Sequence, residues 1–420
     1  MIEVLLSAFL CAPVHAADDR INPRASTDEH NLGKHPVDPA ASHFKPGTGL
    51  VIQSKDGDFM IAPRLRVQIR DELELADEET TNVFGIRRAR LQFKGHVFGK
   101  DNKYKTEFAF SPKDISMDAG VPHRSPLLSW YTEHTQLQNL SLRVGQYKLP
   151  YSRQRVVSSG NQEFVDRTLA QGEFNLDRDI GLHVFSKDLF DLDLFRYQTG
   201  LSIAEGRDSW ETEIIADEAG DAAPSWQYLG RVEVLPFGDF KDYSEVDFKR
   251  LDKVRLSMGA AYAHTANGAK DRGYQGDTFT DGGTVTYDNV TADAIMKWAG
   301  LTAFGEFYYR SGERSEGALQ PGAATADDIY LPRSGMGGSV QLGYLLPGLP
   351  VGIGGRYSAF SPASFSSSET SVVDEHEAGG TLGYFIAGHP FKIQADYFRL
   401  WSDEEQSKSD RVRVQMQVAY

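Results

Sequence analysis

Several basic residues of this sequence occur at every second position, a spacing that suits the binding of anions. One apolar residue separates Arg64 from Arg66, and one separates Arg88 from Arg90. Side chains two apart on a strand share a face, and the planar fork of a guanidinium matches the oxygens of phosphate. The residues that we expect to bind anions from such positions are Arg64, Arg66, Arg88, Arg90, Lys94, Arg143, Arg255, Arg411 and Arg413.

The segments that carry these residues alternate between apolar and polar positions, which is typical of β-strands. The clearest are residues 64–75, 88–97, 103–110 and 411–420, and the last of these ends on Tyr420. On the polar faces of such strands basic residues outnumber acidic ones, although the whole chain has a net charge of −15. We therefore expect the acidic residues to gather in loops and the polar faces to attract anions.

Alternation by itself fits two architectures. In a soluble sandwich the apolar faces cover a core, whereas in a membrane barrel they face lipid and the polar faces line a channel. Three features favour the barrel: the alternating last strand, a secretory start, and the basic polar faces. The expected fold is an all-β transmembrane antiparallel β-barrel of about 16 strands, in which Val412, Val414, Met416 and Val418 face lipid.

Composition excludes several other classes of protein. The 420 residues have a mean hydropathy of −0.41, and no apolar run reaches the length of about 18 residues that a membrane helix needs. The acidic balance argues against nucleic-acid binding. No spacing marks a catalytic triad, a phosphate-binding loop or a cofactor site, so we expect neither an enzyme nor a cofactor.

Residues 1–48 differ in composition from the rest of the chain. Residues 1–16 have a short apolar core followed by small residues, which predicts a secretory signal peptide, although Lys and Arg are absent before the core. Residues 17–48 are polar, rich in proline and without periodicity, which predicts a flexible arm. Residues 49–420 then form the barrel.

Several motifs, taken in order, resemble the phosphate-selective porin O and P family. The resemblance is carried by Arg64-Leu-Arg-Val-Gln68, Arg87-Arg-Ala-Arg-Leu-Gln-Phe-Lys-Gly95, Tyr104-Lys-Thr-Glu-Phe108, Arg143-Val-Gly-Gln-Tyr-Lys-Leu-Pro-Tyr151, Phe164-Val-Asp-Arg167 and Arg178-Asp-Ile-Gly181. The terminal strand also looks like the assembly signal of bacterial outer-membrane proteins. The resemblance implies a homotrimeric, 16-stranded channel in the outer membrane of a Gram-negative bacterium, surrounded by lipid, that passes phosphate, polyphosphate or other small anions along a row of arginines. Of Arg87, Arg88 and Arg90, alternation sends the last two into the lumen and leaves Arg87 at a strand end.

Residues 151–178 lack clean alternation and resemble a constriction loop folded into the pore. Its charged residues are Arg153, Arg155, Arg167, Arg178, Glu163 and Asp166, together with other carboxylates. No lysine occurs in 149–186, so we expect weaker discrimination of phosphate from chloride than in the family's phosphate specialists, unless wall arginines form the site. A general or carbohydrate-specific porin is the alternative, and an outer-membrane enzyme or adhesion barrel is a more distant one.

One short acidic tract contains a histidine and could in principle bind a metal ion. Asp374-Glu-His-Glu377 could hold a divalent ion, but a polar loop of this kind is more often solvated, and we expect no metal site.

Overall fold

The computed structural model describes most of the chain from residue 42 onward, all of it within the unit Asp38–Tyr420. The described ranges are 42–45, 49–76, 79–118, 121–137, 139–207, 209, 224–272, 275–279, 282–315, 332–363, 373–403 and 407–420. The predicted signal peptide and most of the predicted arm lie outside them. Residues 42–45 of the predicted arm form a strand, β1 (Ser42–Lys45), which pairs with β2 (Gly49–Gln53) and which the sequence did not predict.

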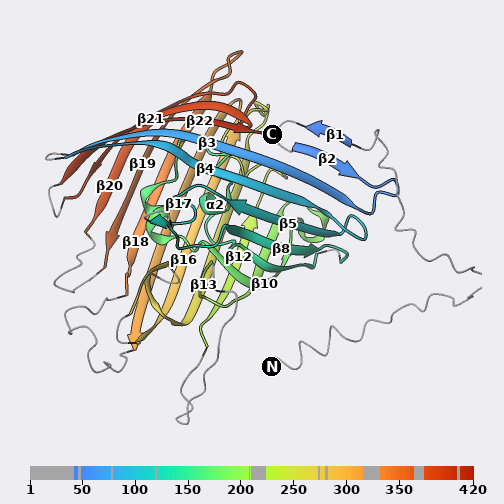
Figure 1. Cartoon of the computed structure of the whole chain (residues 1–420), viewed down its shortest axis with the longest axis horizontal. Coiled ribbons are helices and arrows are strands. Elements are labelled where there is room, and N and C mark those ends of the chain that lie inside the picture. The colour runs from blue at the N-terminus through green and yellow to red at the C-terminus, as the bar shows by residue number, and fades with distance from the viewer. Residues whose placement is uncertain are drawn as a thin grey trace, which may run out of the picture. The chain divides into compact units, whose positions relative to one another are not determined.

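A closed antiparallel barrel of 16 strands accounts for the rest of the sheet, which confirms the predicted fold (Figure 1). Its strands are β3 (Met60–Ala76), β4 (Thr80–His96), β5 (Asn102–Ala109), β8 (Leu127–His134), β9 (Ser141–Lys148), β10 (Arg178–Ser186), β11 (Phe195–Ser202), β12 (Trp226–Val234), β13 (Arg255–Gly268), β16 (Thr284–Trp298), β17 (Leu301–Ser315), β18 (Gly335–Leu345), β19 (Val351–Pro362), β20 (Glu375–Tyr384), β21 (Phe391–Trp401) and β22 (Lys408–Ala419). Each pairs with the next, and β22 pairs with β3 from Ser409↔Ala76 to Ala419↔Arg66, which closes the ring.

Smaller elements lie in the connections. They are β6 (Met117–Asp118), β7 (Val121–Pro122), α2 (Arg153–Val156), α3 (Leu169–Phe174), η2 (Leu189–Asp191), β14 (Lys270–Arg272) and β15 (Gln275–Thr278). No helix among the described residues is long and apolar enough to cross a membrane.

The two ends of the barrel differ in their connections. At one end, here called the turn end, neighbouring strands are joined by short segments such as Ala299–Gly300 and 346–350. At the opposite end, called the loop end, connections such as 149–177 and 316–334 are long. Short turns at one end and long loops at the other are the pattern of outer-membrane barrels.

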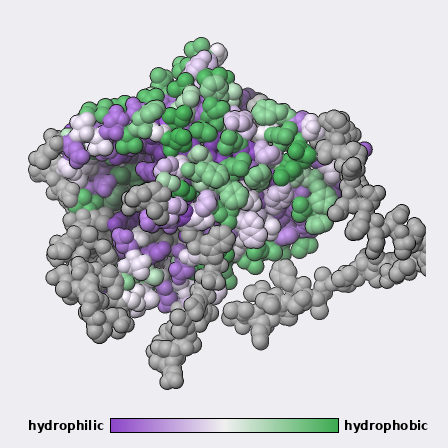
Figure 2. All heavy atoms as spheres, in the orientation of Figure 1, coloured by the Kyte–Doolittle hydropathy of each residue, from purple (hydrophilic) through white to green (hydrophobic). Residues whose placement is uncertain are grey.

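The faces of the strands are inverted relative to a soluble protein. On β22 Val412, Val414 and Met416 are exposed and Val418 is half-buried, whereas the alternate position Arg413 is only 5% exposed. Figure 2 shows hydrophobic residues gathered on the outer surface, over the strands in the upper part of the view. Apolar side chains on the outside of the barrel and polar ones inside are the arrangement expected of a barrel in lipid, as the sequence predicted.

Candidate functional site

The inner wall of β3 and β4 carries the first predicted arginines. Arg66 is 5% exposed and Arg88 is 3% exposed, while Leu65 and Ala89, the apolar residues that follow Arg64 and Arg88, are half-buried. Register along this pair is regular from Met60↔His96 to Gln68↔Arg88 and then shifts, because Ile69 pairs with Ile86.

The shift makes Arg87 the extra residue of a β-bulge. A bulge leaves one residue unpaired and re-aims its side chain, so Arg87 points inward beside Arg88. The prediction that Arg87 lies at a strand end is wrong, because β4 begins at Thr80. Alternation could not reveal this, since the bulge inverts the pattern of residues 80–86.

Three arginines of β3 and β4 converge on one carboxylate of the constriction loop, defined here as residues 149–177. Asp166 lies 2.6 Å from Arg70, 3.2 Å from Arg88 and 3.5 Å from Arg87. Burial would raise the pKa of Asp166, but Arg88, Arg87 and Arg70 lower it well below its usual value. Arg88 is therefore an anchor of the loop, whereas the sequence predicted a pore-lining group.

Further anchors of the loop lie on other strands of the barrel. Backbone N–H groups of Val165 and Leu169 donate to carboxylates of β21 and β20, at 3.2 and 3.1 Å. Apolar residues of the loop, including Tyr151, Ala170 and Phe174, form a buried cluster with Leu229 and other inward residues of β12, β13, β17 and β19. The loop therefore fills the side of the lumen that these strands line.

Arg153 is the most deeply enclosed anchor. Its side chain is 0% exposed and bonds Asp293, Asp242 at 2.7 Å and Glu233 at 3.2 Å. Burial would lower its pKa, but Tyr243, Asp293 and Glu233 raise it above the usual value, so the guanidinium stays charged.

The remaining loop residues predicted from the sequence have local partners. Arg155 pairs with Asp177, and Arg167 donates to the carbonyls of Gln154 and Val157 at 3.0 and 2.8 Å. Burial and Arg155 lower the pKa of Arg167 to about 9. Arg178 is the first residue of β10 rather than part of the loop, and it pairs with Asp177 at 3.2 Å.

Glu163 has an unusual environment within the loop. Its carboxyl is 3% exposed, and Oε2 has no hydrogen-bond partner among the described residues. Its backbone N–H donates to Glu245 at 2.8 Å. Burial and then Glu245 raise the pKa of Glu163 well above its usual value, although Lys297 and Lys392 oppose the change.

A second inward loop was missed by the sequence reasoning. Residues 235–254, between β12 and β13, fold into the barrel from the turn end. Asp242 bonds Arg153, and Glu245 accepts from Glu163 and donates its own N–H to the carbonyl of Asn161 at 3.0 Å. The available signal was length, because about twenty residues without alternation are unusual at an end where other turns are short.

The space left by the two loops includes a basic cavity of about 350 Å³ against β3, β4, β5, β9 and β10. Its basic lining residues are Arg64, Arg66, Arg90, Lys94, Lys105, Arg143, Lys148 and Arg178. Glu107 is the carboxylate among the described lining residues, and Val156, Ser158 and Ser159 of the constriction loop close the other side. Five of the nine predicted wall residues thus meet in one place.

Charge compensation within the cavity is uneven. Arg90 is held by Asp114 through bonds of 2.9 and 2.7 Å, and Arg143 lies 2.7 Å from Glu133. Burial would raise the pKa of Asp114, but Arg90 lowers it to about 2. Across the described part of the chain, by contrast, neither Arg64 nor Arg66 lies within ion-pair distance of a carboxylate; Arg66 donates to Ser158 at 3.3 Å.

A larger cavity of about 510 Å³ adjoins the first. Arg143, Lys148 and Val156 line both cavities, which makes the two spaces neighbours along β9 to β11. The larger one has mixed charge: Arg196 and Lys187 face Glu233 and several aspartates, including Asp239. The two cavities together outline a route along one wall of the barrel.

The last three predicted wall residues lie elsewhere. Arg413 forms a two-bond pair with Asp396, at 2.8 and 2.9 Å. Arg411 lies 3.0 Å from Glu74, and Arg255 donates to the carbonyl of Phe237 at the turn end. None of the three lines either cavity.

Comparison with known proteins agrees with this architecture. A family model described as phosphate-selective porin O and P matches residues 62–420. An uncharacterized protein of Aquifex aeolicus (strain VF5) is 26% identical over 405 residues, covering 85% of this chain and 87% of that protein. OmpT, an outer membrane protein of Vibrio cholerae, superposes with a TM-score of 0.53 at 11% identity, covering 88% of this chain and 99% of OmpT. The outer membrane channel DcaP of Acinetobacter baumannii gives 0.51 at 12% identity, with 88% and 99% covered. These structural likenesses show the fold.

Proposed function

The chain belongs to the phosphate-selective porin O and P family, and from this premise we propose that it passes small anions, phosphate or polyphosphate among them, by passive diffusion past the basic cavity. Its location is the outer membrane of a Gram-negative bacterium. The proposal includes a homotrimer and a channel without enzymatic activity.

The observation that carries the proposal is the pair Arg64 and Arg66. Both face a cavity rich in basic groups, and within the described residues neither lies within ion-pair distance of a carboxylate, although Glu107 also lines the cavity. Charge without a close counter-ion in a confined space exerts a strong local field. An anion entering the cavity would replace water at these guanidinium groups, whose forks suit two oxygens of one phosphate.

The cavity contains lysines that the loop lacks. The absence of lysine from residues 149–186 predicts weak discrimination of phosphate from chloride. The wall supplies Lys94, Lys105 and Lys148 instead, which supports the alternative that the wall forms the site. Weak discrimination of phosphate from chloride stays a prediction, which phosphate block of the chloride current tests.

The test is ion selectivity in planar bilayers. We expect the reversal potential in a salt gradient to show anion preference, which Arg64→Gln and Arg66→Gln together should reduce. Arg411→Gln is the matched control, because it removes an inner-wall charge outside the cavity. Cation preference in the wild type, or equal loss in the control, would contradict the proposal.

Phosphate added to chloride solution separates a phosphate site from a general anion path. We expect phosphate to lower chloride conductance only at millimolar concentrations, and the Arg64→Gln/Arg66→Gln double variant to remove that block. Block at micromolar phosphate would contradict weak discrimination. The mixed charge of the larger cavity favours a second function, a general or carbohydrate-conducting small-solute porin. Absence of block, with neutral sugars entering liposomes rapidly, would favour that second function.

A further inference from the structure

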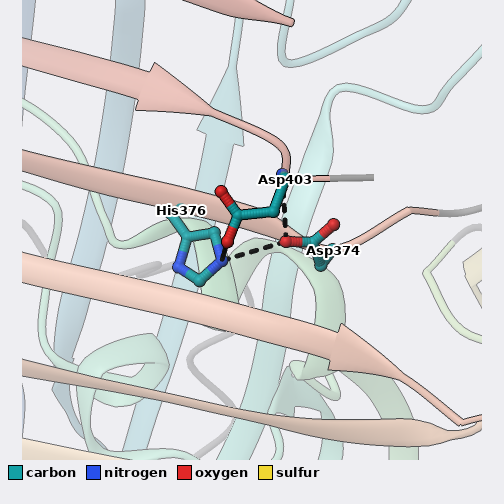
Figure 3. A group of neighbouring side chains, drawn as sticks. All are labelled: Asp374, His376 and Asp403. Carbon is teal, nitrogen blue, oxygen red and sulfur yellow. Dashed lines mark hydrogen bonds and ion pairs between the residues drawn. The ribbon is translucent and has the colours of Figure 1, made fainter. Parts of the chain in front are cut away.

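Three side chains with metal-ligating atoms meet at the loop end, away from both cavities. Asp374 directly precedes β20, His376 is its second residue, and Asp403 follows β21 (Figure 3). Each offers one ligand atom, and all three atoms lie within 4.8 Å of one another. Among the described residues this is the one such group of His, Cys, Asp and Glu.

The geometry of the group is compact. His376 Nε2 lies 3.0 Å from an oxygen of Asp374 and 3.8 Å from an oxygen of Asp403. The side chains of Asp374 and His376 are 13% and 21% exposed, whereas Asp403 is 77% exposed. The site is therefore built on two partly buried groups and is open to solvent on the third side, which leaves room for water ligands.

Neighbouring residues fix the orientation of the ligands. The imidazole of His376 stacks on Trp401 with centroids 5.1 Å apart and planes at 9°. Its second nitrogen, Nδ1, lies 2.8 Å from the hydroxyl of Tyr357. Asp374 accepts hydrogen bonds from the backbone N–H of Asp403 and from the hydroxyl of Ser402, both at 3.2 Å. Such outer contacts commonly orient metal ligands.

The hydroxyl of Tyr357 suits two states of the imidazole. Without a metal, Nε2–H of His376 donates to Asp374, and Nδ1 accepts from the tyrosine hydroxyl. With a metal on Nε2, the proton moves to Nδ1, which donates to the same hydroxyl, because a hydroxyl both donates and accepts. The partners of the ring therefore do not oppose metal binding.

We propose that Asp374, His376 and Asp403 bind one Zn²⁺ ion, which joins the β19–β20 connection to the β21–β22 connection at the loop end. One imidazole nitrogen and two carboxylate oxygens form a donor set that Zn²⁺ accepts, with water as a further ligand. Ca²⁺ and Mg²⁺ prefer oxygen ligands throughout, so the histidine favours the transition metal. The divalent charge would offset two carboxylates that approach the same nitrogen of one imidazole.

The sequence favours solvation of residues 374–377 because the tract resembles a polar loop, whereas in the structure Glu375 is the first residue of β20. Strand alternation turns Glu377 into the barrel, where it lies 3.1 Å from Arg356. The third ligand, Asp403, comes from a different connection, and only the pairing of β20 with β21 brings it near His376.

The test uses the full folded protein, stripped with EDTA and titrated with Zn²⁺ by calorimetry, and with Co²⁺ by visible absorption. We expect saturable binding of one Zn²⁺ per chain at this site. His376→Gln should abolish it, and Asp403→Asn should weaken it by about tenfold or more. The control is His264→Gln. His264 lies 2.9 Å from Asp288, but among the described residues these two are not part of a group of three metal-ligating side chains.

Each outcome bears directly on the site. Loss of one Zn²⁺ equivalent in His376→Gln but not in the His264→Gln control supports it. The proposal is overturned if His376→Gln retains the wild-type stoichiometry, since binding then lies elsewhere, for example at histidines of the N-terminal arm. It is also overturned if the wild type shows no saturable Zn²⁺ binding, or if equimolar Ca²⁺ displaces Zn²⁺. Heat-modifiable migration on gels confirms that each variant is folded.

Discussion

Replacing Arg153 by methionine tests how the constriction loop is held. Methionine fills much of the same volume but removes the charge. Arg153 is 0% exposed, and its partners Glu233, Asp242 and Asp293 are each at most 4% exposed. The interaction therefore belongs with buried ion pairs rather than with surface pairs, which contribute little.

The magnitude follows from that burial. Removing one partner of a buried ion pair typically costs about 3–5 kcal/mol, because the remaining charge has no compensation. A change of about 1.4 kcal/mol alters an equilibrium constant tenfold. The ratio of docked to undocked loop should therefore fall by roughly a hundred- to several-thousand-fold. Arg231 and Arg196 still contact Glu233, at 2.9 and 3.2 Å, which places the expected loss near the lower figure.

Single-channel recording is the assay. We expect Arg153→Met to raise conductance and open-channel noise, because the loop no longer stays docked. We also expect a lower anion preference, because the lumen loses one positive charge while its carboxylates remain. Arg153→Lys should restore the charge but not the fork that reaches several carboxylates, so its behaviour should be intermediate.

Arg155→Met is the matched control. It lies in the same short helix, α2, but its side chain is 20% exposed, and its partner Asp177 is 17% exposed. Its removal should have a small effect. If folded Arg153→Met has wild-type conductance, noise and selectivity, the buried ion pairs do not hold the loop and the reasoning is refuted.

Other predictions concern the loop and the barrel seam. Because the pKa of Glu163 is raised by burial and by Glu245, the docked loop holds a proton that the undocked loop loses; docking is strongest below the ordinary pKa and weakens as pH rises through the raised one. Noise should therefore increase with pH in the wild type, and a persistent increase in Glu163→Gln would contradict this. Gly343→Ala places a Cβ in collision with the carboxylate of Glu163, so conductance should rise, whereas Gly355→Ala, whose Cβ is 3.9 Å from its nearest neighbour, should leave conductance unchanged. Deleting Tyr420 removes two backbone hydrogen bonds to β3, of 2.7 and 2.9 Å; normal yields of heat-modifiable protein would show that this closure is dispensable.

The sequence predicted the barrel because membrane strands obey a simple rule of alternation. Apolar residues face lipid and polar residues face the water-filled lumen, so the directions of Val412 and Arg413 can be predicted from their residue types alone. The rule fails where the backbone departs from regular pairing. The bulge at Arg87 reverses the alternation of the residues before it, and no residue type marks the position.

The site was harder to predict because alternation gives the face of a residue but not its partner. Arg153 meets Glu233 and Asp293, which come from strands β12 and β16, at sequence separations of 80 and 140. The inward path of the loop containing Asp242 creates the third contact. Such pairing depends on how two loops enter the lumen from opposite ends, and local sequence does not encode that path in any simple pattern.

Counting charges on strand faces therefore overstates how widely the lumen attracts anions. Arg413 and Arg88 face inward as predicted, yet Asp396 and Asp166 neutralise them. A permeating ion responds to charge that is not already compensated at close range, because a paired guanidinium and carboxylate form a dipole whose field falls off faster than that of a single charge. Anion preference should accordingly arise on the side of the lumen lined by β3 to β10, where Arg64 and its neighbours face the cavity. Arg70 and Arg88 lie on the same strands but contribute less to this preference, because they pair with Asp166 of the constriction loop.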